Sequence, residues 1–202
     1  MGIVRGLFGP SRQEIWKQLS EEIGARYVEG GLWKGDKVEA VHGEWTVTLD
    51  SYAVSTGKVT VVYTRMRAPY INPDGFRFTI YRHGLFSGIG RLFGMQDVDI
   101  GDEPFDREFI IKGTDEAKLR ALFGSPRIRE LVRQQPEIRL TVRDADRNWF
   151  GPKYPDDVDE LVFEVAGVIK DVERLKRLYD LFAEVLDQLT RMGSAYERAP
   201  SR

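Results

Sequence analysis

Residues 25–81 alternate between apolar and polar side chains with a period of two, and this pattern constrains the fold more than any other feature of the sequence. In the stretch "EWTVTL", Trp45, Val47 and Leu49 alternate with threonines, as expected for a strand with one buried face. The stretches "KVTVVYTRMR" and "GFRFTIYR" alternate in the same way, and the breaks between strands are short and rich in turn residues, at positions 30–31, 34–36, 56–57 and 72–75. Because a parallel crossover needs a dozen residues or more, strands joined by such short breaks are predicted to form an antiparallel meander.

A helix is predicted before this strand-rich region. Ser11 followed by Glu14 matches a capping box, in which the two residues bond each other's backbone N–H groups. Apolar residues between 15 and 23 then form one stripe at helical spacing, and Gly24 supplies a stop.

Further elements follow the strand-rich region. A middle helical segment begins with Thr114 or Asp115 as its cap and restarts at Ser125-Pro126, since proline suits the first helical position. The last helix is predicted to begin after Asp171 and to run to about Met192, with apolar residues spaced alternately by three and four. The strands predicted in this part of the chain are 107–113, 137–143 and 160–168.

These elements predict an α+β fold: a large antiparallel meander sheet, on which an N-terminal helix, a middle helical segment and a long C-terminal helix pack. Residues 11–192 are predicted to form a single domain, preceded by a flexible or amphipathic segment at 1–10 and followed by a disordered tail at 193–202. The alternative is two sheet-plus-helix halves, 11–134 and 135–192, that share one sheet, because both contain a strand followed by an Asp-capped helix.

Composition excludes several classes of protein. The chain of 202 residues has no cysteine, which rules out disulfides, thiolate zinc sites and cysteine nucleophiles. Its net charge of -2 gives no general attraction to nucleic acid or to an acidic membrane surface. No apolar run approaches the ~20 residues that span a bilayer, so we predict a cytoplasmic protein without a transmembrane segment.

The stretch "FGMQDVDIGDEPFDREF" concentrates oxygen ligands of the kind that calcium binds. Its match to a calcium loop fails, however, because Gly101 occupies the place of an acidic ligand and Asp102 that of the turn glycine. We therefore predict no metal site, but a solvated turn with local caps that leads into a strand carrying Asp106 and Glu108 on one face. The six acidic residues are Asp97, Asp99, Asp102, Glu103, Asp106 and Glu108.

The same region carries a resemblance to known sequences. "DIGDEPFDREFIIKGTDEAKLRALF" resembles uncharacterised bacterial families of unknown function, in which a G-D-x-x-F-D-x-x-F segment leads into a strand and then an Asp-capped helix. The resemblance covers roughly 25 residues and implies a bacterial origin and no established activity. The matching residues are Gly101, Asp102, Phe105, Asp106 and Phe109, followed by Asp115, Ala117 and Leu119.

The stretch "YRHGLFSGIGRLFGMQ" contains the candidate ligand or partner site. Its glycines do not match a nucleotide-binding fingerprint, so we predict no cofactor. Its apolar residues fall on one face of a glycine-loosened helix, which either packs on the sheet as a lid or contacts a protein partner, an apolar ligand or a lipid surface. Residues 1–8 have a similar character, and with few positive charges either segment would bind a membrane weakly. The candidate residues are Leu85, Phe86, Ile89, Leu92 and Phe93.

The sequence offers little for catalysis. His42 and His83 are its two histidines, they have no metal-site spacing, and no nucleophile–base pair is recognisable, so no catalytic residue is predicted. The alternative is a hydrolase or isomerase that uses His83 with one of Asp97, Asp99 or Asp106 as an acid/base pair.

Nucleic-acid binding is also disfavoured. Residues 112–147 hold nine basic side chains against six acidic ones, an excess too small for a basic binding surface. The function predicted is therefore a non-catalytic binding or interaction module for a protein partner or an apolar ligand. The enzyme described above is one alternative, and a structural protein that self-associates through its final helix is a weaker one, with the oligomeric state left open.

Overall fold

The computed structural model describes residues 10–31, 35–84, 95–145 and 154–196. Within these ranges nine strands form one antiparallel sheet in the order β1-β2-β3-β4-β9-β8-β5-β7-β6. The strands are β1 (Arg26–Val28), β2 (Lys37–His42), β3 (Trp45–Ser55), β4 (Thr60–Ile71), β5 (Phe78–Arg82), β6 (Gln96–Asp97), β7 (Phe109–Gly113), β8 (Arg139–Asp144) and β9 (Val158–Ala166). The helices are α1 (Arg12–Glu22), α2 (Glu103–Glu108), α3 (Glu116–Phe123), α4 (Pro126–Arg133) and α5 (Val172–Arg191). The predicted α+β fold is confirmed.

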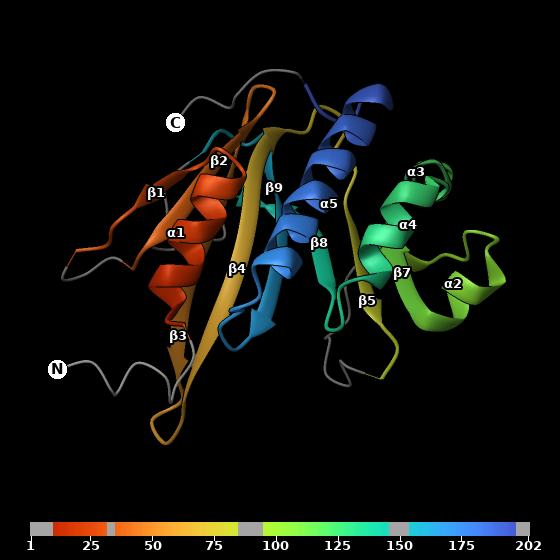
Figure 1. The fold of residues 1–202 in the computed structure, drawn as a ribbon. Coiled ribbons are helices and arrows are strands. Elements are labelled where there is room, and N and C mark those ends of the chain that lie inside the picture. Colours follow the sequence, from red (N-terminus) through yellow and green to blue (C-terminus); the bar gives the residue numbers. More distant parts are fainter. Residues whose placement is uncertain (1–9, 32–34, 85–94, 146–153, 197–202) are drawn as a thin grey trace, which may run out of the picture.

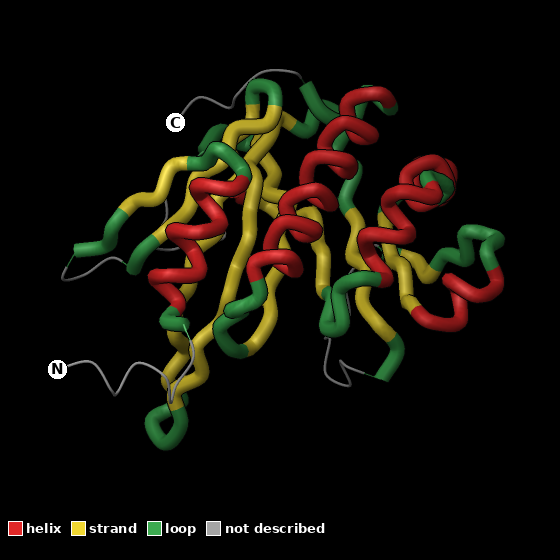
Figure 2. Tube along the Cα trace, in the orientation of Figure 1, coloured by secondary structure: helices red, strands yellow, loops and turns green. Residues whose placement is uncertain are grey.

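The helices α1, α4 and α5 lie against one face of the sheet (Figure 1), and Figure 2 shows the same two layers coloured by element type. Cross-strand partners point to the same side of a sheet, so the register creates rows of side chains across it. The central row on the helix side is apolar and joins the buried stripes of α1 and α5 in one core cluster. That row runs through Tyr27, Val38, Leu49, Met66, Phe163, Leu140, Ile80 and Ile111.

Local capping sets the starts of the helices, as the sequence predicts. Ser11 and Glu14 form the reciprocal capping box at the start of α1. The side chain of Asp115 accepts the backbone N–H of Lys118, and that of Asp171 caps α5 in the same way. Each cap satisfies an N–H group that would otherwise lack a partner in the first helical turn, and a single cap contributes about 1 kcal/mol.

The prediction of a simple meander is right for β1 to β4 and wrong at the next step. Strands β9 and β8 lie between β4 and β5, so the link at 72–77 crosses two strand ends instead of closing a hairpin. Asp159, at the start of β9, is 2 % exposed and binds both ends of this link. It accepts hydrogen bonds from Asn72 Nδ2 (2.6 Å) and from Arg77 Nε and Nη2 (2.8 and 2.7 Å). The turn residues predicted a reversal of the chain correctly, but a reversal does not require the two strands to pair.

The segment before β7 is a helix, which corrects the prediction of a turn leading into a strand at 107. Asp102 caps α2 by accepting the N–H of Phe105, and the helix ends where β7 begins. Phe105 and Phe109 are four residues apart, and their ring centroids lie 4.6 Å from each other. Phe105 is fully buried, and a helix places residues four apart on the same face. The contact between the two rings therefore favours a helix here over the alternation expected for a strand.

The ends of the chain are described only in part. Residues 1–9 of the segment predicted to be flexible or amphipathic lie outside the described ranges. Of the tail predicted at 193–202, residues 193–196 are described, and Ser194 is fully buried. Its hydroxyl donates to Asp74 Oδ2 at 2.9 Å and accepts from Lys118 Nζ at 3.0 Å, which connects this end to the link between β4 and β5.

Candidate functional site

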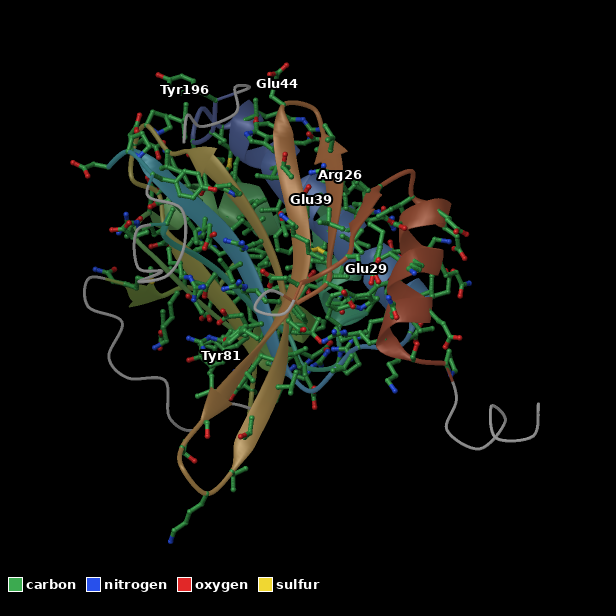
Figure 3. The ribbon with its side chains drawn as sticks, turned by 90° about the vertical axis from the view of Figure 1, so that its left-hand side faces the viewer. Arg26, Glu29, Glu39, Glu44, Tyr81 and Tyr196 are labelled. Carbon is green, nitrogen blue, oxygen red and sulfur yellow. The ribbon has the colours of Figure 1, made fainter. Side chains whose placement is uncertain are left out.

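The second face of the sheet, opposite α1 and α5, is polar. In Figure 3 the helix α1 lies to the right of the sheet, and the labelled Tyr81 side chain lies on the other side. The register aligns one row of side chains on this face across all nine strands, and a single member of the row, Val162, is aliphatic. The row is Arg26, Glu39, Thr48, Arg67, Val162, Thr141, Thr79, Lys112 and Asp97.

Ion pairs neutralise the middle of the polar face. Three arginines on β4 and β8 alternate in space with three carboxylates on β3 and β9, so their formal charges cancel. Such a layer is ordered and partly desolvated, and it has no excess charge with which to attract an ion. The pairs are Asp50 with Arg65 (2.7 Å) and Arg67 (3.5 Å), Glu160 with Arg67 (3.2 Å) and Arg143 (3.9 Å), and Glu164 with Arg143 (3.2 Å).

Strands β3 and β4 extend beyond their neighbours and form a two-stranded ribbon, residues 52–63, at one end of the sheet (Figure 1). The pairing of β3 with β2 ends at Leu49, and the pairing of β4 with β9 ends at Thr64. Beyond these points Tyr63 forms an isolated bridge with Gly167. The backbone N–H of Gly167 donates to the Val62 carbonyl at 2.7 Å. We call residues 52–63 the β3–β4 ribbon.

The β3–β4 ribbon exposes valine side chains on both faces. Val54 pairs with Val61 on the polar side of the sheet, and Ala53 pairs with Val62 on the helix side. Five large hydrophobic side chains of the described residues are exposed, and three of them lie in the ribbon: Val54 (43 %), Val59 (59 %) and Val62 (36 %).

The ribbon is also nearly free of charge. Charged residues make up 31 % of the chain, yet residues 51–64 contain one, Lys58. A hairpin normally buries one apolar face against the core and keeps the other polar. A ribbon that exposes valines on both faces is therefore suited to contact another molecule.

Aromatic stacking fixes the base of the ribbon. The rings of Tyr52 and Tyr63 stack with centroids 5.3 Å apart and an angle of 14° between their planes. The Arg65 guanidinium lies 5.0 Å from the centroid of the Tyr52 ring while it is held by two hydrogen bonds to Asp50. Burial raises the pKa of Tyr52 to about 12, and the negative charge of nearby Glu164 acts in the same direction. The ribbon thus joins the ion-pair layer through an ordered ring stack.

We expect Tyr52 to ionise later than an ordinary tyrosine, whose pKa is about 10. Because the folded-state pKa of about 12 lies above the unfolded one, the contribution of Tyr52 to stability is complete below pH ~10 and is lost as the pH rises toward 12. NMR of ¹³C-labelled tyrosine rings measures this. Burial also raises the pKa of Tyr27, Tyr70 and Tyr179, so several resonances should titrate late, and Tyr52→Phe should remove the one with its midpoint near pH 12. The control Tyr196→Phe should leave it in place, and loss of an ordinary titration near pH 10 in Tyr52→Phe would contradict the assignment.

Two of the three carboxylates predicted as alternative catalytic residues, Asp97 and Asp106, have structural partners. Asp97 forms an ion pair with Lys112 (2.8 Å) at the edge of the sheet. Asp106 accepts the backbone N–H groups of Ile100 and Gly101, both at 3.0 Å, and so closes the turn before α2.

The remaining members of that set, His83 and Asp99, are exposed. The backbone N–H of His83 donates to the carbonyl of Glu108 at 3.0 Å. An acid/base pair with His83 stays a prediction, as does the absence of a catalytic residue. Among the residues that the structure describes, no three His, Asp or Glu side chains come together in a way that could hold a metal ion.

The predicted partner site falls on residues 85–94, which lie outside the described ranges, so it also stays a prediction. Its residues are Leu85, Phe86, Ile89, Leu92 and Phe93. The β3–β4 ribbon was missed by sequence reasoning, although a signal existed. Strands β3 and β4 have 11 and 12 residues, about twice the usual length, and the stretch with a single charge, Lys58, coincides with their joined ends.

Comparison with known proteins shows a shared fold. No protein-family model matches the sequence, and no curated protein matches it. The crystal structure of the mycobacterial trehalose monomycolate transport factor A, TtfA, is similar with a TM-score of 0.54. The match covers 95 % of this chain and 98 % of that one at 11 % sequence identity, so the likeness extends over the whole architecture. None of the helices in the described ranges has the length and apolar character needed to cross a membrane, and the cytoplasmic location stays a prediction.

Proposed function

We propose that this chain is a non-catalytic binding module that holds a protein partner through the β3–β4 ribbon. The observation that carries the proposal is the gathering of Val54, Val59 and Val62, all exposed, on a ribbon that extends past both neighbouring strands. Apolar side chains on a protruding element lose unfavourable contact with water when a partner covers them.

The chemistry of the ribbon favours a protein over a lipid surface. Apart from Ala53, Gly57 and Lys58, its residues are valine, threonine, serine and tyrosine. Valine, threonine and tyrosine are common in strands, and tyrosine is enriched at protein interfaces. The ribbon has none of the Trp, Phe and Leu residues that anchor segments in membranes, and its single Lys58 gives little attraction to anionic lipid. The similar solved protein is described as a transport factor, and a binding role for this chain agrees with that description.

The test replaces Val54 and Val62 together by serine. Each valine is partly exposed, so its burial by a partner contributes about 1 kcal/mol to the free energy of binding. Loss of both contributions should weaken binding of the partner about 30-fold. A photo-crosslinking residue at Val59 captures the partner from native extract, and mass spectrometry quantifies it. The matched control is Val41→Ser, which alters an exposed valine (72 %) on β2, away from the ribbon.

Equal recovery of crosslinked partner from Val54→Ser/Val62→Ser and from the wild-type chain would refute the proposal. Co-flotation with vesicles of neutral and anionic phospholipid that depends on the two valines would instead assign the ribbon to a lipid surface. A dimer in light scattering that the double variant disrupts would assign it to self-association.

The segment at 85–93 is proposed as a second contact, on the sequence argument that its apolar residues share one face. Phe86→Ser/Phe93→Ser is measured in the same crosslinking assay. If the recovery of every partner is unchanged by that double variant, the segment has no part in binding, whatever the outcome for the ribbon.

A further inference from the structure

The backbone of the β3–β4 ribbon has a definite pattern of free hydrogen-bonding groups. The N–H of Thr56 donates to the carbonyl of Val59 at 3.0 Å and closes the turn, which makes this pair a hydrogen-bonded one. Such pairs alternate along an antiparallel ladder, so the N–H and C=O groups of Ala53 and Ser55 point outward from the ribbon. The bond from Gly167 to the Val62 carbonyl confirms the alternation, since Val62 is the partner of Ala53.

Of the two edges of the ribbon, the β3 edge is the one that no described strand pairs with. On the β4 edge, the outward carbonyl of Val62 already accepts a hydrogen bond from Gly167. On the β3 edge, the pairing with β2 stops at Leu49, and Gly35 comes next to the carbonyl of Ser51. In the ranges that the structure describes, no strand pairs with β3 beyond this point.

The open edge also lacks the usual protection against strand pairing. Natural sheets protect such edges with proline, charged side chains or a bulge that twists the edge away. Residues 51–55 contain no proline and no charge, and the register between β3 and β4 continues without a bulge from Thr48 to Ser55. An unprotected edge on a ribbon that exposes valines on both faces can accept another strand.

We infer that an extended segment of the protein partner adds to the sheet as a strand along Ala53 and Ser55. The inference rests on the proposed function and specifies how the ribbon binds. A standard protein interface buries about 800 Å² per partner, more than three partly exposed valines can provide, so backbone pairing supplies contact that the side chains do not. The segment has apolar residues at every second position and an acidic residue near the turn, where Lys58 is the sole charge of the ribbon.

The probe is a displayed library of 12-residue peptides. Peptides that bind Val54→Ser/Val62→Ser are removed first, and the remaining peptides are selected for binding to the immobilised full chain. Ala53→Pro removes the outward N–H while leaving the inner ladder bonds of its neighbours, and proline is tolerated at such edge positions. The selected peptides should bind Ala53→Pro at least tenfold more weakly, and the control Ala53→Ser within about twofold of the wild-type chain.

A second measurement covers the case in which Ala53→Pro alters the fold, which circular dichroism reveals. N-methylation of every second backbone nitrogen in the selected peptide removes the hydrogen bonds that those nitrogens donate. Methylation of one alternate set of nitrogens should weaken binding to the wild-type chain at least tenfold, and methylation of the other set should change it little.

Two results would overturn the inference. Binding that depends on Val54 and Val62 but not on Ala53→Pro or on N-methylation would show docking through side chains alone, and the proposed function would stand. Failure of the library to yield any peptide that depends on the two valines counts against the strand addition, whereas crosslinking of a partner at Val59 decides the proposed function separately.

Discussion

Replacing Phe163 by alanine is expected to lower the free energy of unfolding by about 4 kcal/mol, within the range measured for large-to-small changes in cores. Phe163 is fully buried on β9, and its register partners are Met66 on β4 and Leu140 on β8. The strands around it come from distant parts of the chain, so they cannot easily close over the cavity. Chemical denaturation monitored by tryptophan fluorescence measures the change.

The control is Phe163→Leu, which keeps most of the apolar volume and should cost less than about 1.5 kcal/mol. A loss below about 1 kcal/mol for Phe163→Ala would mean that the centre of the sheet repacks freely. Most single domains have 5–15 kcal/mol of stability, so the expected loss removes a large part of it.

Replacing Asp159 by alanine is expected to cost about 3 kcal/mol. The substitution removes the carboxylate that binds Asn72 and Arg77, and with it three hydrogen bonds across the link between β4 and β5. The Arg77 side chain is 38 % exposed, so water solvates the released charge and keeps the loss below that of a fully buried pair. Denaturation midpoints of the wild type and the variant give the difference.

The double variant Asp159→Ala/Arg77→Ala separates the ion pair from the rest. We expect Arg77→Ala alone to cost at least as much, because it leaves the buried Asp159 carboxylate with the hydrogen bond from Asn72 and without its ion-pair partner. The two changes together should cost clearly less than their sum. Additive losses would show that the two side chains act independently, and that the link is held by its backbone bond from Asn72 to the carbonyl of Asp157 (2.8 Å).

The elements that the sequence predicts well depend on contacts between near neighbours. Ser11, Asp115 and Asp171 each cap a helix through a backbone group three residues away. The turn at 56–59 closes a hairpin within four residues, and the alternation of β3 and β4 then fixes which residues face the core. These interactions are short in range, so a pattern of residue types is enough to predict them.

The errors arise where distant residues compete for the same segment. Residues 103–108 were expected to lead into a strand, but the ring of Phe105 packs near Phe109 and Phe123, at centroid distances of 4.6 and 6.3 Å, and this favours a helix. The candidate site at 85–93 rests on its apolar stripe alone, lies outside the described ranges and stays a prediction. An apolar stripe in the sequence does not show whether the rest of the chain covers it. The sequence likewise does not show that the valines of the ribbon are exposed.

Periodicity and hydrogen bonds between residues close in the chain suffice to predict the antiparallel strands, the helix caps, the order of the first four strands and the apolar face of α5. Long-range packing sets the position of β9 and β8 between β4 and β5, and it sets how far β3 and β4 continue past their neighbours. The reason is that strand order and exposure follow from which distant segments bury the most apolar surface together. Within the described ranges no strand lies beside β3 at Ala53, the edge on which the further inference rests.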